Sequence, residues 1–378
     1  MRTPPNPVRI LYVGDVTPGG TCAQRLRAFE DLGCLMTPVS LADPGNRNRN
    51  RALPERIRRR LLGPRDWVGA NQRIVAHARQ STFDILWIDR GLTIEAQTLR
   101  AVREFQPTCR IVGYSPDDMN GRHNQSRQFR THLAYYDIYF TTKSYGVAEL
   151  RAMGCPAAAF TGNAYDPYTH RPLPVSAADR ERFGGPVGFI GTREEARAES
   201  MYRLARAGIP VRVWGDGWQR QRKQHPNLRI EGRPLWGDDY ALAISGFDIN
   251  LCFLRKLNRD LQTTRSVEIP ACGAFMLAER TAEHQALFQE GREAEFFASD
   301  DELLERVQYY LAHDEERHQI AAAGRERCLR AGYSYRERMA EILETLGGGW
   351  KRPPTDGSSR LGAVSMSGSM WKGQRSCA

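Results

Sequence analysis

The sequence predicts an α/β protein of two domains, each a parallel sheet wrapped by helices. Three observations favour this class. Short β-branched runs alternate with helical patterns along most of the chain, as they do in strand–helix–strand units. The 378 residues are many for one α/β domain and ordinary for two. Hydrophobic residues make up 41% and charged residues 26% of the chain, which is typical of packed globular proteins.

The first domain is predicted over residues 1–170. It begins with the strand-like run 8–13, which leads through a glycine loop into a helical pattern. Because this loop lacks the Gly-x-Gly-x-x-Gly spacing of dinucleotide-binding folds, the sequence disfavours NAD binding. Further strand-like runs lie at 83–89, 110–114, 138–142 and 157–161.

The second domain is predicted over residues 171–346. The alternation restarts after the turn-rich stretch 166–174. Strand-like runs lie at 187–190, 211–214, 228–230 and 248–252, and helical patterns at 197–207, 301–311 and 318–331. Residues 347–378 lose all periodicity and are rich in Gly, Ser and Pro, so we expect a disordered tail there.

The composition indicates which partners, location and metal content to expect. The formal net charge of +10 indicates anionic partners, which include nucleotide diphosphates, nucleic acids and anionic lipids. No apolar run is long enough for a membrane span and no secretory pattern is present, so we expect a cytoplasmic protein. The eight cysteines and eight histidines stand singly, which indicates reduced thiols and no structural metal site.

The segment 46–65 is rich in arginine. It holds eight arginines and one glutamate. Two interpretations stay open: a contact with an anionic membrane surface, which would make the protein membrane-peripheral, and a solvated insertion with one docking helix. The apolar face of this segment is short, which favours the second interpretation.

The segment 260–277 carries the strongest chemical signal. A polar, threonine-rich loop leads there into a short helix, with Thr263 and Thr264 where N-caps are expected. The free N–H groups and the dipole at such a helix start suit a diphosphate. We therefore expect Thr264 and Ser266 to face donor phosphates, while Arg265 adds a formal charge.

Four segments of the second half carry a resemblance to a known family. They are Arg265–Gly273, Phe288–Phe297, Asp301–Leu303 and Tyr309–Leu311. Together they resemble the C-terminal, group 1-type domain of CgeB-like (spore-maturation) glycosyltransferases, and more distantly the large retaining group with two glutamates separated by seven residues. The resemblance implies the GT-B fold, in which two Rossmann-like domains with parallel sheets face a central cleft. It also implies a nucleotide-diphosphate sugar as the donor.

In the large retaining group, the second glutamate binds the donor ribose and the first contacts the transferred sugar. Glu268 matches the second, and its place one turn into the helix suits hydrogen bonds from vicinal ribose hydroxyls. Asp260 matches the first, so the resemblance implies a catalytic role with an aspartate where the group has a glutamate. Because of this departure, the resemblance does not fix whether the anomeric configuration is retained.

Glycines and arginines elsewhere fit the same template. The resemblance implies that Gly191 opens a segment whose arginine, Arg197 in preference to Arg193, approaches the donor phosphates. The alternative is a surface arginine paired with a neighbouring glutamate. Gly215 is implied near the nucleotide and Gly232 against its base, and both glycines also suit plain turns.

In the first domain, the resemblance implies that the loop with Gly19 and Gly20 faces the cleft. Asp117 and Asp118 follow a predicted strand, at the carboxyl edge where α/β proteins bind ligands, and the CgeB-like family has a similar pair. Either carboxylate can deprotonate or orient an acceptor hydroxyl. The alternative is a turn-capping role.

The sequence therefore predicts a glycosyltransferase with no tightly bound cofactor. It moves a sugar to an acceptor hydroxyl on a glycan, protein, lipid or small molecule. Mg²⁺ is compatible with this chemistry and not required, because no Asp-x-Asp motif precedes a suitable strand. The alternatives are a sugar-nucleotide 2-epimerase of the same fold and a basic nucleic-acid-binding module. Arginines without interleaved aromatic residues disfavour the second alternative.

Overall fold

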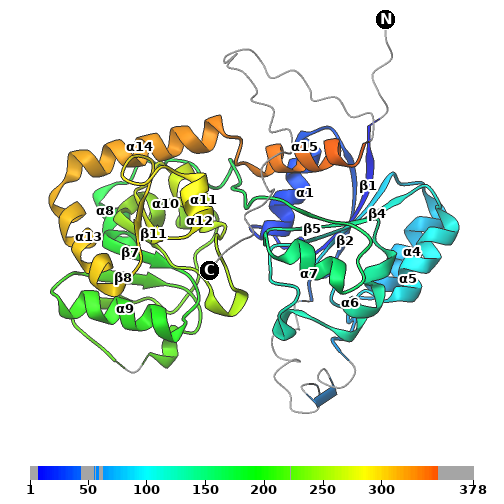
Figure 1. Cartoon of the computed structure of the whole chain (residues 1–378), viewed down its shortest axis with the longest axis horizontal. Coiled ribbons are helices and arrows are strands. Elements are labelled where there is room, and N and C mark those ends of the chain that lie inside the picture. Colours follow the sequence, from blue (N-terminus) through cyan, green and yellow to red (C-terminus); the bar gives the residue numbers. More distant parts are fainter. Residues whose placement is uncertain (1–6, 44–54, 56, 59–62, 222, 348–378) are drawn as a thin grey trace, which may run out of the picture.

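The computed structural model describes residues 7–43, 55, 57–58, 63–221 and 223–347. It contains two α/β domains that lie side by side (Figure 1). The tail expected beyond Gly347 and most of the basic segment 46–65 lie outside the described residues. In the part of the chain that the structure describes, no helix is long and apolar enough to cross a membrane.

The first domain is built on a sheet of six parallel strands in the order β2-β1-β3-β4-β5-β6. The strands are β1 (Arg9–Gly14), β2 (Leu35–Ser40), β3 (Ile85–Asp89), β4 (Arg110–Ser115), β5 (Ile138–Thr141) and β6 (Ala158–Phe160). The chain runs outward from β1 to β2 and then returns to the other side of β1. Such a reversal opens a crevice at the carboxyl ends of the strands, where α/β proteins bind ligands.

Helices cover both faces of this sheet. One face is covered by α4 (Ala70–Gln80), α5 (Ala96–Phe105), α6 (Arg127–His132) and α7 (Gly146–Ala152), and the other by α1 (Thr21–Asp31). The alternation of side chains along β1 explains the two layers. Leu11 and Val13 enter the core beneath α4 and α5, whereas Ile10 and Tyr12 enter the core beneath α1.

The second domain repeats this plan with the strand order β12-β11-β10-β7-β8-β9, again all parallel. The strands are β7 (Gly185–Ile190), β8 (Val211–Trp214), β9 (Leu228–Ile230), β10 (Phe247–Cys252), β11 (Met276–Glu279) and β12 (Glu295–Phe297). The order reverses between β7 and β10. The predicted fold class is thus confirmed for both domains.

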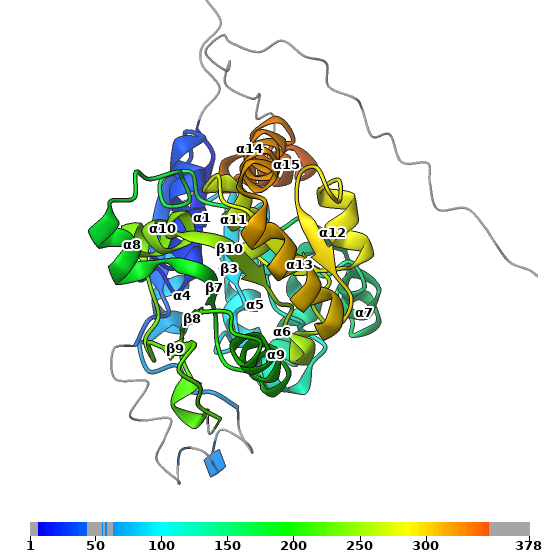
Figure 2. The ribbon, with the colours of Figure 1, turned by 90° about the vertical axis from the view of Figure 1, so that its left-hand side faces the viewer.

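The helices of the second domain also form two layers. They are α8 (Ala177–Phe183), α9 (Glu195–Arg206), α10 (Gly237–Gly246), α11 (Arg265–Ala271), α12 (Ala282–Leu287), α13 (Asp300–Ala312) and α14 (Asp314–Arg330). Side chains of α9 and α13 share one core, and those of α8, α10 and α11 share the other. Figure 2 shows α8 and α10 on one side of β7 and β10, with α13 on the other.

The last described helix, α15 (Tyr335–Thr345), returns to the first domain and lies beside α1 (Figure 1). Its Met339 and Leu343 are buried in the same core as Phe29 of α1. The predicted limits, 1–170 and 171–346, assign this helix to the second domain, whereas its side chains complete the first.

The chain therefore crosses between the domains twice, and the two crossings lie side by side. The N–H of Tyr165 donates to the carbonyl of Tyr333 at 3.1 Å, and the N–H of Tyr335 donates to the carbonyl of Tyr165 at 2.8 Å. The two backbone segments thus support each other where the domains meet.

Candidate functional site

Two cavities lie between the domains, at the carboxyl ends of both sheets. The first, the apolar cavity, has a volume of about 260 Å³ and is lined on one side by Ile190, Pro234, Leu235 and Trp236. The second, the polar cavity, has a volume of about 310 Å³, and its charged lining includes Asp117, Lys143, Arg255 and Asp260. The two cavities share Gly191, Thr192, Thr264 and Arg265. A ligand that extends through both must pass these four residues.

The position of the cavities follows from the topology. Gly191 comes directly after β7, and Gly215 comes directly after β8. The two loops approach so closely that a Cβ on Gly215 would lie 2.1 Å from the carbonyl oxygen of Gly191, and Gly215 has a φ of 137°. Only glycine fits there. These glycines bring the backbone of the second sheet up to the cleft.

Arg197 is the most confined cation of the site. Its side chain is 4% exposed, and its Nη1 donates to the carbonyl of Thr192 at 2.9 Å. Its Nε and Nη2 atoms are buried without a hydrogen-bond acceptor, and the nearest carboxylate oxygen, of Glu194, is 3.8 Å from Nη2. Burial lowers the pKa of Arg197, and the positive charge of Arg265 lowers it further. Buried donors of this kind require an acceptor, so Nε and Nη2 of Arg197 suit an anionic ligand.

Arg265 begins α11 and lines both cavities. Its Nε is also buried without an acceptor. Thr264 lines both cavities with it, but it does not cap the helix with its side chain as expected. A different side-chain hydrogen bond forms at the helix start: the hydroxyl oxygen of Ser266 accepts the N–H of Thr263 at 3.0 Å.

Ser266 is fully buried and lines neither cavity. Its hydroxyl lies 2.7 Å from Nε2 of His284, and Nδ1 of that ring donates to the carbonyl of Glu279 at 2.6 Å. Since Nδ1 carries the proton of the neutral ring, Nε2 accepts from Ser266. Burial lowers the pKa of His284, which keeps the ring neutral. Ser266 therefore holds the loop before α11 and does not face a ligand.

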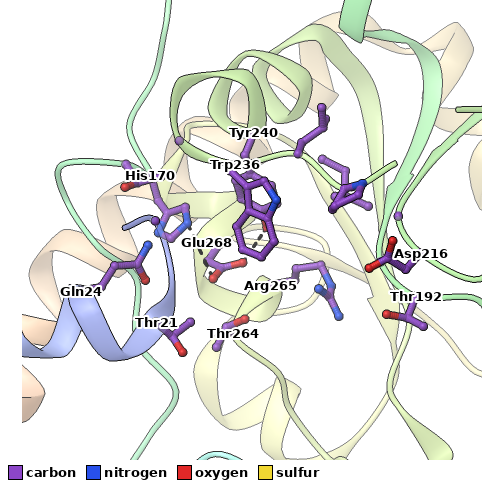
Figure 3. Close-up of a pocket in the computed structure, with 18 residues that line it drawn as sticks. Thr21, Gln24, His170, Thr192, Asp216, Trp236, Tyr240, Thr264, Arg265 and Glu268 are labelled. Atoms are coloured by element: carbon purple, nitrogen blue, oxygen red, sulfur yellow. Dashed lines mark hydrogen bonds and ion pairs between the residues drawn. The ribbon is translucent and has the colours of Figure 1, made fainter. Parts of the chain in front are cut away.

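Glu268 points into the apolar cavity with Tyr240 and His170 beside it (Figure 3). The hydroxyl of Tyr240 donates to Oε2 of Glu268 at 2.6 Å. Nε2 of His170 lies 3.7 Å from Oε1, too far for a direct hydrogen bond. Because Nδ1 of His170 accepts the N–H of Asp166 at 2.9 Å, the proton of the neutral ring is on Nε2. A donor and an acceptor thus lie side by side at the cavity, close enough for one ligand oxygen to bond both.

The polar cavity contains an ion pair from opposite domains. Nζ of Lys143, which follows β5, lies 2.6 Å from Oδ1 of Asp260, and both side chains are less than a tenth exposed. Burial raises the pKa of Asp260, although the charge of Lys143 opposes this. Within the described ranges, no three His, Cys, Asp or Glu side chains form a group that could hold a metal ion.

The two aspartates after β4 differ in their surroundings. Asp117 lines the polar cavity, where its Oδ1 accepts from Asn258 at 3.1 Å and its Oδ2 pairs with Arg90 at 3.1 Å. Asp118 lines neither cavity and is 2% exposed. Both of its carboxylate oxygens accept from Arg259, and Oδ1 also accepts the N–H of Asn120 at 3.1 Å. Asp118 is thus committed to an interdomain contact and to its own turn.

Most of the expected site residues come together here, but others lie outside the two cavities. The cavities are lined by Gly19, Asp117, Gly191, Arg197, Gly215, Asp260, Thr264, Arg265 and Glu268. The expected residues that line neither are Gly20, Asp118, Arg193, Gly232 and Ser266. Arg193 instead bonds Gln221 at 3.1 Å and Glu195 at 2.7 Å, away from both cavities.

Several lining residues had no assigned role at the sequence level. They are Thr21, Gln24, His170, Asp216, Trp236 and Tyr240. His170 and Tyr240 lie far from Glu268 along the chain. His170 belongs to the turn-rich stretch between the domains, which resembles the hinge of the family, and a chain must pass the cleft there.

Comparisons with known proteins agree with this architecture. Residues 193–344 match the family model described as glycosyl transferase-like. HepE from Anabaena, solved in complex with UDP and glucose, is similar over 90% of this chain and 99% of its own, with a TM-score of 0.60 and 14% identity. The chain has the GT-B fold.

Other GT-B structures show how widely this fold is used. A glycosyltransferase from Rickettsia africae covers 90% of this chain and 98% of its own, with a TM-score of 0.62 and 11% identity. A putative UDP-N-acetylglucosamine 2-epimerase from Listeria monocytogenes is similar over 92% of this chain and 98% of its own, with a TM-score of 0.53 and 11% identity. A search of curated protein sequences gives no significant match. Because the fold hosts different reactions, function must be argued from the site.

Proposed function

We propose that the protein is a glycosyltransferase that moves a sugar from a nucleotide-diphosphate sugar to an acceptor hydroxyl. The observation that carries this is the pair of Arg265, at the junction of the two cavities, and Arg197, which lines the polar cavity beside it. Both have buried N–H groups without acceptors. A diphosphate supplies several anionic oxygens, and arginine N–H groups match phosphate oxygens well.

The linings on either side of the junction support a donor that lies with its nucleoside in the apolar cavity, its diphosphate at the junction and its sugar in the polar cavity. The apolar cavity suits a nucleoside, because it combines apolar walls with Glu268 and His170. His170 Nε2 and Glu268 Oε1 are 3.7 Å apart, so one ribose hydroxyl in the cavity can bridge them, accepting from Nε2 and donating to Oε1. The polar cavity suits the transferred sugar, whose hydroxyls need the partners that Lys143 and Asp260 provide.

Side chains at the junction and in the polar cavity would then catalyse the transfer of the sugar. We assign Asp117 to the acceptor: it takes the proton of the acceptor hydroxyl as that oxygen bonds to the anomeric carbon. The bond from that carbon to the diphosphate oxygen breaks, and the nucleotide leaves with the electron pair. Arg197 and Arg265 stabilise the charge that develops on it.

Two further findings support the proposal. The glycosyl transferase-like match covers α9 and α11, which hold both arginines and Glu268. HepE, of the same fold, was solved with UDP and glucose. We also propose that the protein belongs to the CgeB-like group, on the strength of the four segments of the second half that resemble it.

A thermal-shift screen tests the donor site. UDP, GDP, ADP, dTDP and their sugar conjugates are added to the wild type, and we expect at least one to raise the melting temperature. Arg197→Ala and Arg265→Ala should lose this response. Arg193→Ala is the matched control, because Arg193 lies near the same loop but faces neither cavity. If no nucleotide stabilises the wild type, or if all three variants respond equally, the proposal is wrong.

Product analysis separates the alternatives. With the nucleotide sugar that binds, a glycosyltransferase releases the nucleoside diphosphate, whereas a 2-epimerase gives a C2-isomeric sugar. Asp117→Asn should abolish release without loss of nucleotide binding, and Asp118→Asn, next to it but outside the cavities, should retain both. Stabilisation by oligonucleotides alone would favour the nucleic-acid alternative. Repeating the assay with EDTA tests the need for Mg²⁺.

A further inference from the structure

The apolar cavity has an aromatic wall that stands out among the described residues. Trp236 is 61% exposed, the largest exposed fraction of any large hydrophobic side chain described. Three other exposed aromatic residues have partners: Arg79 lies over Phe105, Arg27 over Tyr168, and His313 stacks on Tyr309. Phe160, which is 44% exposed, lines neither cavity. No ring, cation or hydrogen-bond acceptor among the described residues pairs with the Trp236 indole. A ligand that covers this indole would remove a large apolar surface from water, which favours binding.

The backbone fixes Trp236 at the cavity. It is the residue before α10 and has an extended backbone (φ −140°, ψ 155°), and Leu235 before it is buried. Gly237 after it has a φ of 55°, which favours glycine. From the other domain, a Cβ on Gly19 would lie 4.0 Å from Cβ of Trp236. The indole therefore stands at the boundary between the two domains, in the cavity that Glu268 also lines (Figure 3).

We propose that Trp236 is the stacking platform for the nucleobase of the donor. This rests on the proposed function, since it places a nucleoside in the apolar cavity. Trp236 lines that cavity and not the polar one, so a ligand held by Glu268 and Arg265 presents its base, and not its transferred sugar, to the indole. A flat aromatic base buries the indole face, and every base has such a face.

This role predicts that Trp236 contributes to the affinity for ligands with a base and not to the affinity for the diphosphate. Stacking on an aromatic side chain is sequence-tolerant and contributes about 5- to 150-fold in affinity per base. Trp236→Ala should therefore weaken binding of the nucleoside diphosphate by a factor in this range. Binding of inorganic pyrophosphate, which has no base, should not change. Trp236→Phe should keep most of the affinity, because it keeps an aromatic face.

The experiment is isothermal titration of the full chain with UDP, GDP, ADP and pyrophosphate. Wild type, Trp236→Ala, Trp236→Phe and the control Phe160→Ala are compared, since Phe160 is exposed but lines neither cavity. Selective loss of nucleotide affinity in Trp236→Ala supports the platform. Equal loss for pyrophosphate, or no loss, overturns it. If no nucleotide and no pyrophosphate binds to the wild type, the proposed function itself fails.

A fluorescence measurement covers the case in which Trp236→Ala does not fold. Nucleotide binding should change the tryptophan emission of the wild type, because a stacked base alters the environment of an exposed indole. The same nucleotide should give a much smaller change in Trp236→Phe at saturation. An equal change in both proteins would contradict stacking on this residue.

Discussion

The guanidinium of Arg259, in the second domain, forms a bidentate ion pair with the carboxylate of Asp118, in the first. Nε lies 2.7 Å from Oδ2, and Nη2 lies 2.9 Å from Oδ1. Arg259 also forms two hydrogen bonds with Glu149, at 2.9 and 2.8 Å. Its backbone is left-handed, with a φ of 50°, which is uncommon for a residue other than glycine. Next to it, the side-chain amide of Asn258 donates to Oδ1 of Asp117 at 3.1 Å and accepts from Asn124 at 2.8 Å. The loop of the second domain is therefore anchored in the first domain beside the polar cavity.

This contact predicts a pH dependence of stability. Burial opposes ionisation of Asp118, but the hydrogen bonds and charge of Arg259 outweigh it, so the pKa of Asp118 is lowered. A carboxylate with a lowered pKa stabilises the fold above the ordinary value of about 3.9, and this contribution is lost as the pH falls through the folded value. Asp118→Asn should lower the unfolding free energy at pH 7 and flatten its acid dependence below about pH 4. Urea unfolding across pH measures both, with the exposed Glu305→Gln as control.

A buried histidine predicts a second pH effect at milder acidity. His132 is fully buried, its Nδ1 donates to the carbonyl of Ile94 at 2.9 Å, and burial lowers its pKa from 6.5 to about 4. The unfolded chain takes up a proton near pH 6.5 while the folded chain does not. Stability from this group is therefore complete above pH 6.5 and decreases toward pH 4, by up to about 3 kcal/mol. His132→Gln should remove this slope, whereas the exposed His318→Gln should leave it unchanged.

The buried ion pair of Arg25 and Asp89 predicts that substitutions at the two residues have non-additive effects on the unfolding free energy. Both side chains are about 1% exposed, and Nε and Nη2 of Arg25 lie 2.9 and 3.0 Å from the two oxygens of Asp89. Arg25→Met leaves a buried carboxylate unpaired and should lower the unfolding free energy by about 3–5 kcal/mol. Arg25→Met with Asp89→Leu should recover most of this loss, because Tyr12 can still donate to the carbonyl of Cys22. Additive losses in a double-mutant cycle would contradict the pairing.

The arrangement of His170 and Glu268 predicts discrimination between ribose and deoxyribose. One hydroxyl bridging the two groups makes hydrogen bonds that its removal would abolish. We expect the 2′-deoxy or the 3′-deoxy form of the bound nucleotide to bind about tenfold more weakly than the ribonucleotide. Glu268→Ala should bind all three forms alike. Equal affinity of the wild type for all three would exclude the bridge.

The sequence predicted both sheets because parallel strands buried on two faces read as continuous apolar runs. β3 and β8, buried along their whole length, are examples. β2 was not predicted, since it lies at the edge of its sheet, carries Pro38, and is only partly buried. Edge strands of this kind lack the apolar signal on which such predictions depend.

Part of the site was predictable because it follows directly after strands and at a helix start. Arg265 and Glu268 were expected in this way, and Arg197 was expected from the family resemblance; all three line the cavities. Trp236 and His170 were not, because their role depends on how the two domains meet and not on any local pattern. Ser266 was expected at the ligand because its spacing suits a helix start, but His284, 18 residues away, takes its hydroxyl.

The return of α15 to the first domain has a consequence for how the protein is made. Phe29, near the start of the chain, stays without its covering layer until the ribosome has added Met339 and Leu343. The second domain is complete before then, so the later half of the chain can finish folding before the earlier half. Residues 1–170 alone would lack the part of the core beside α1 that α15 supplies, whereas 171–334 already contains both layers of its own sheet.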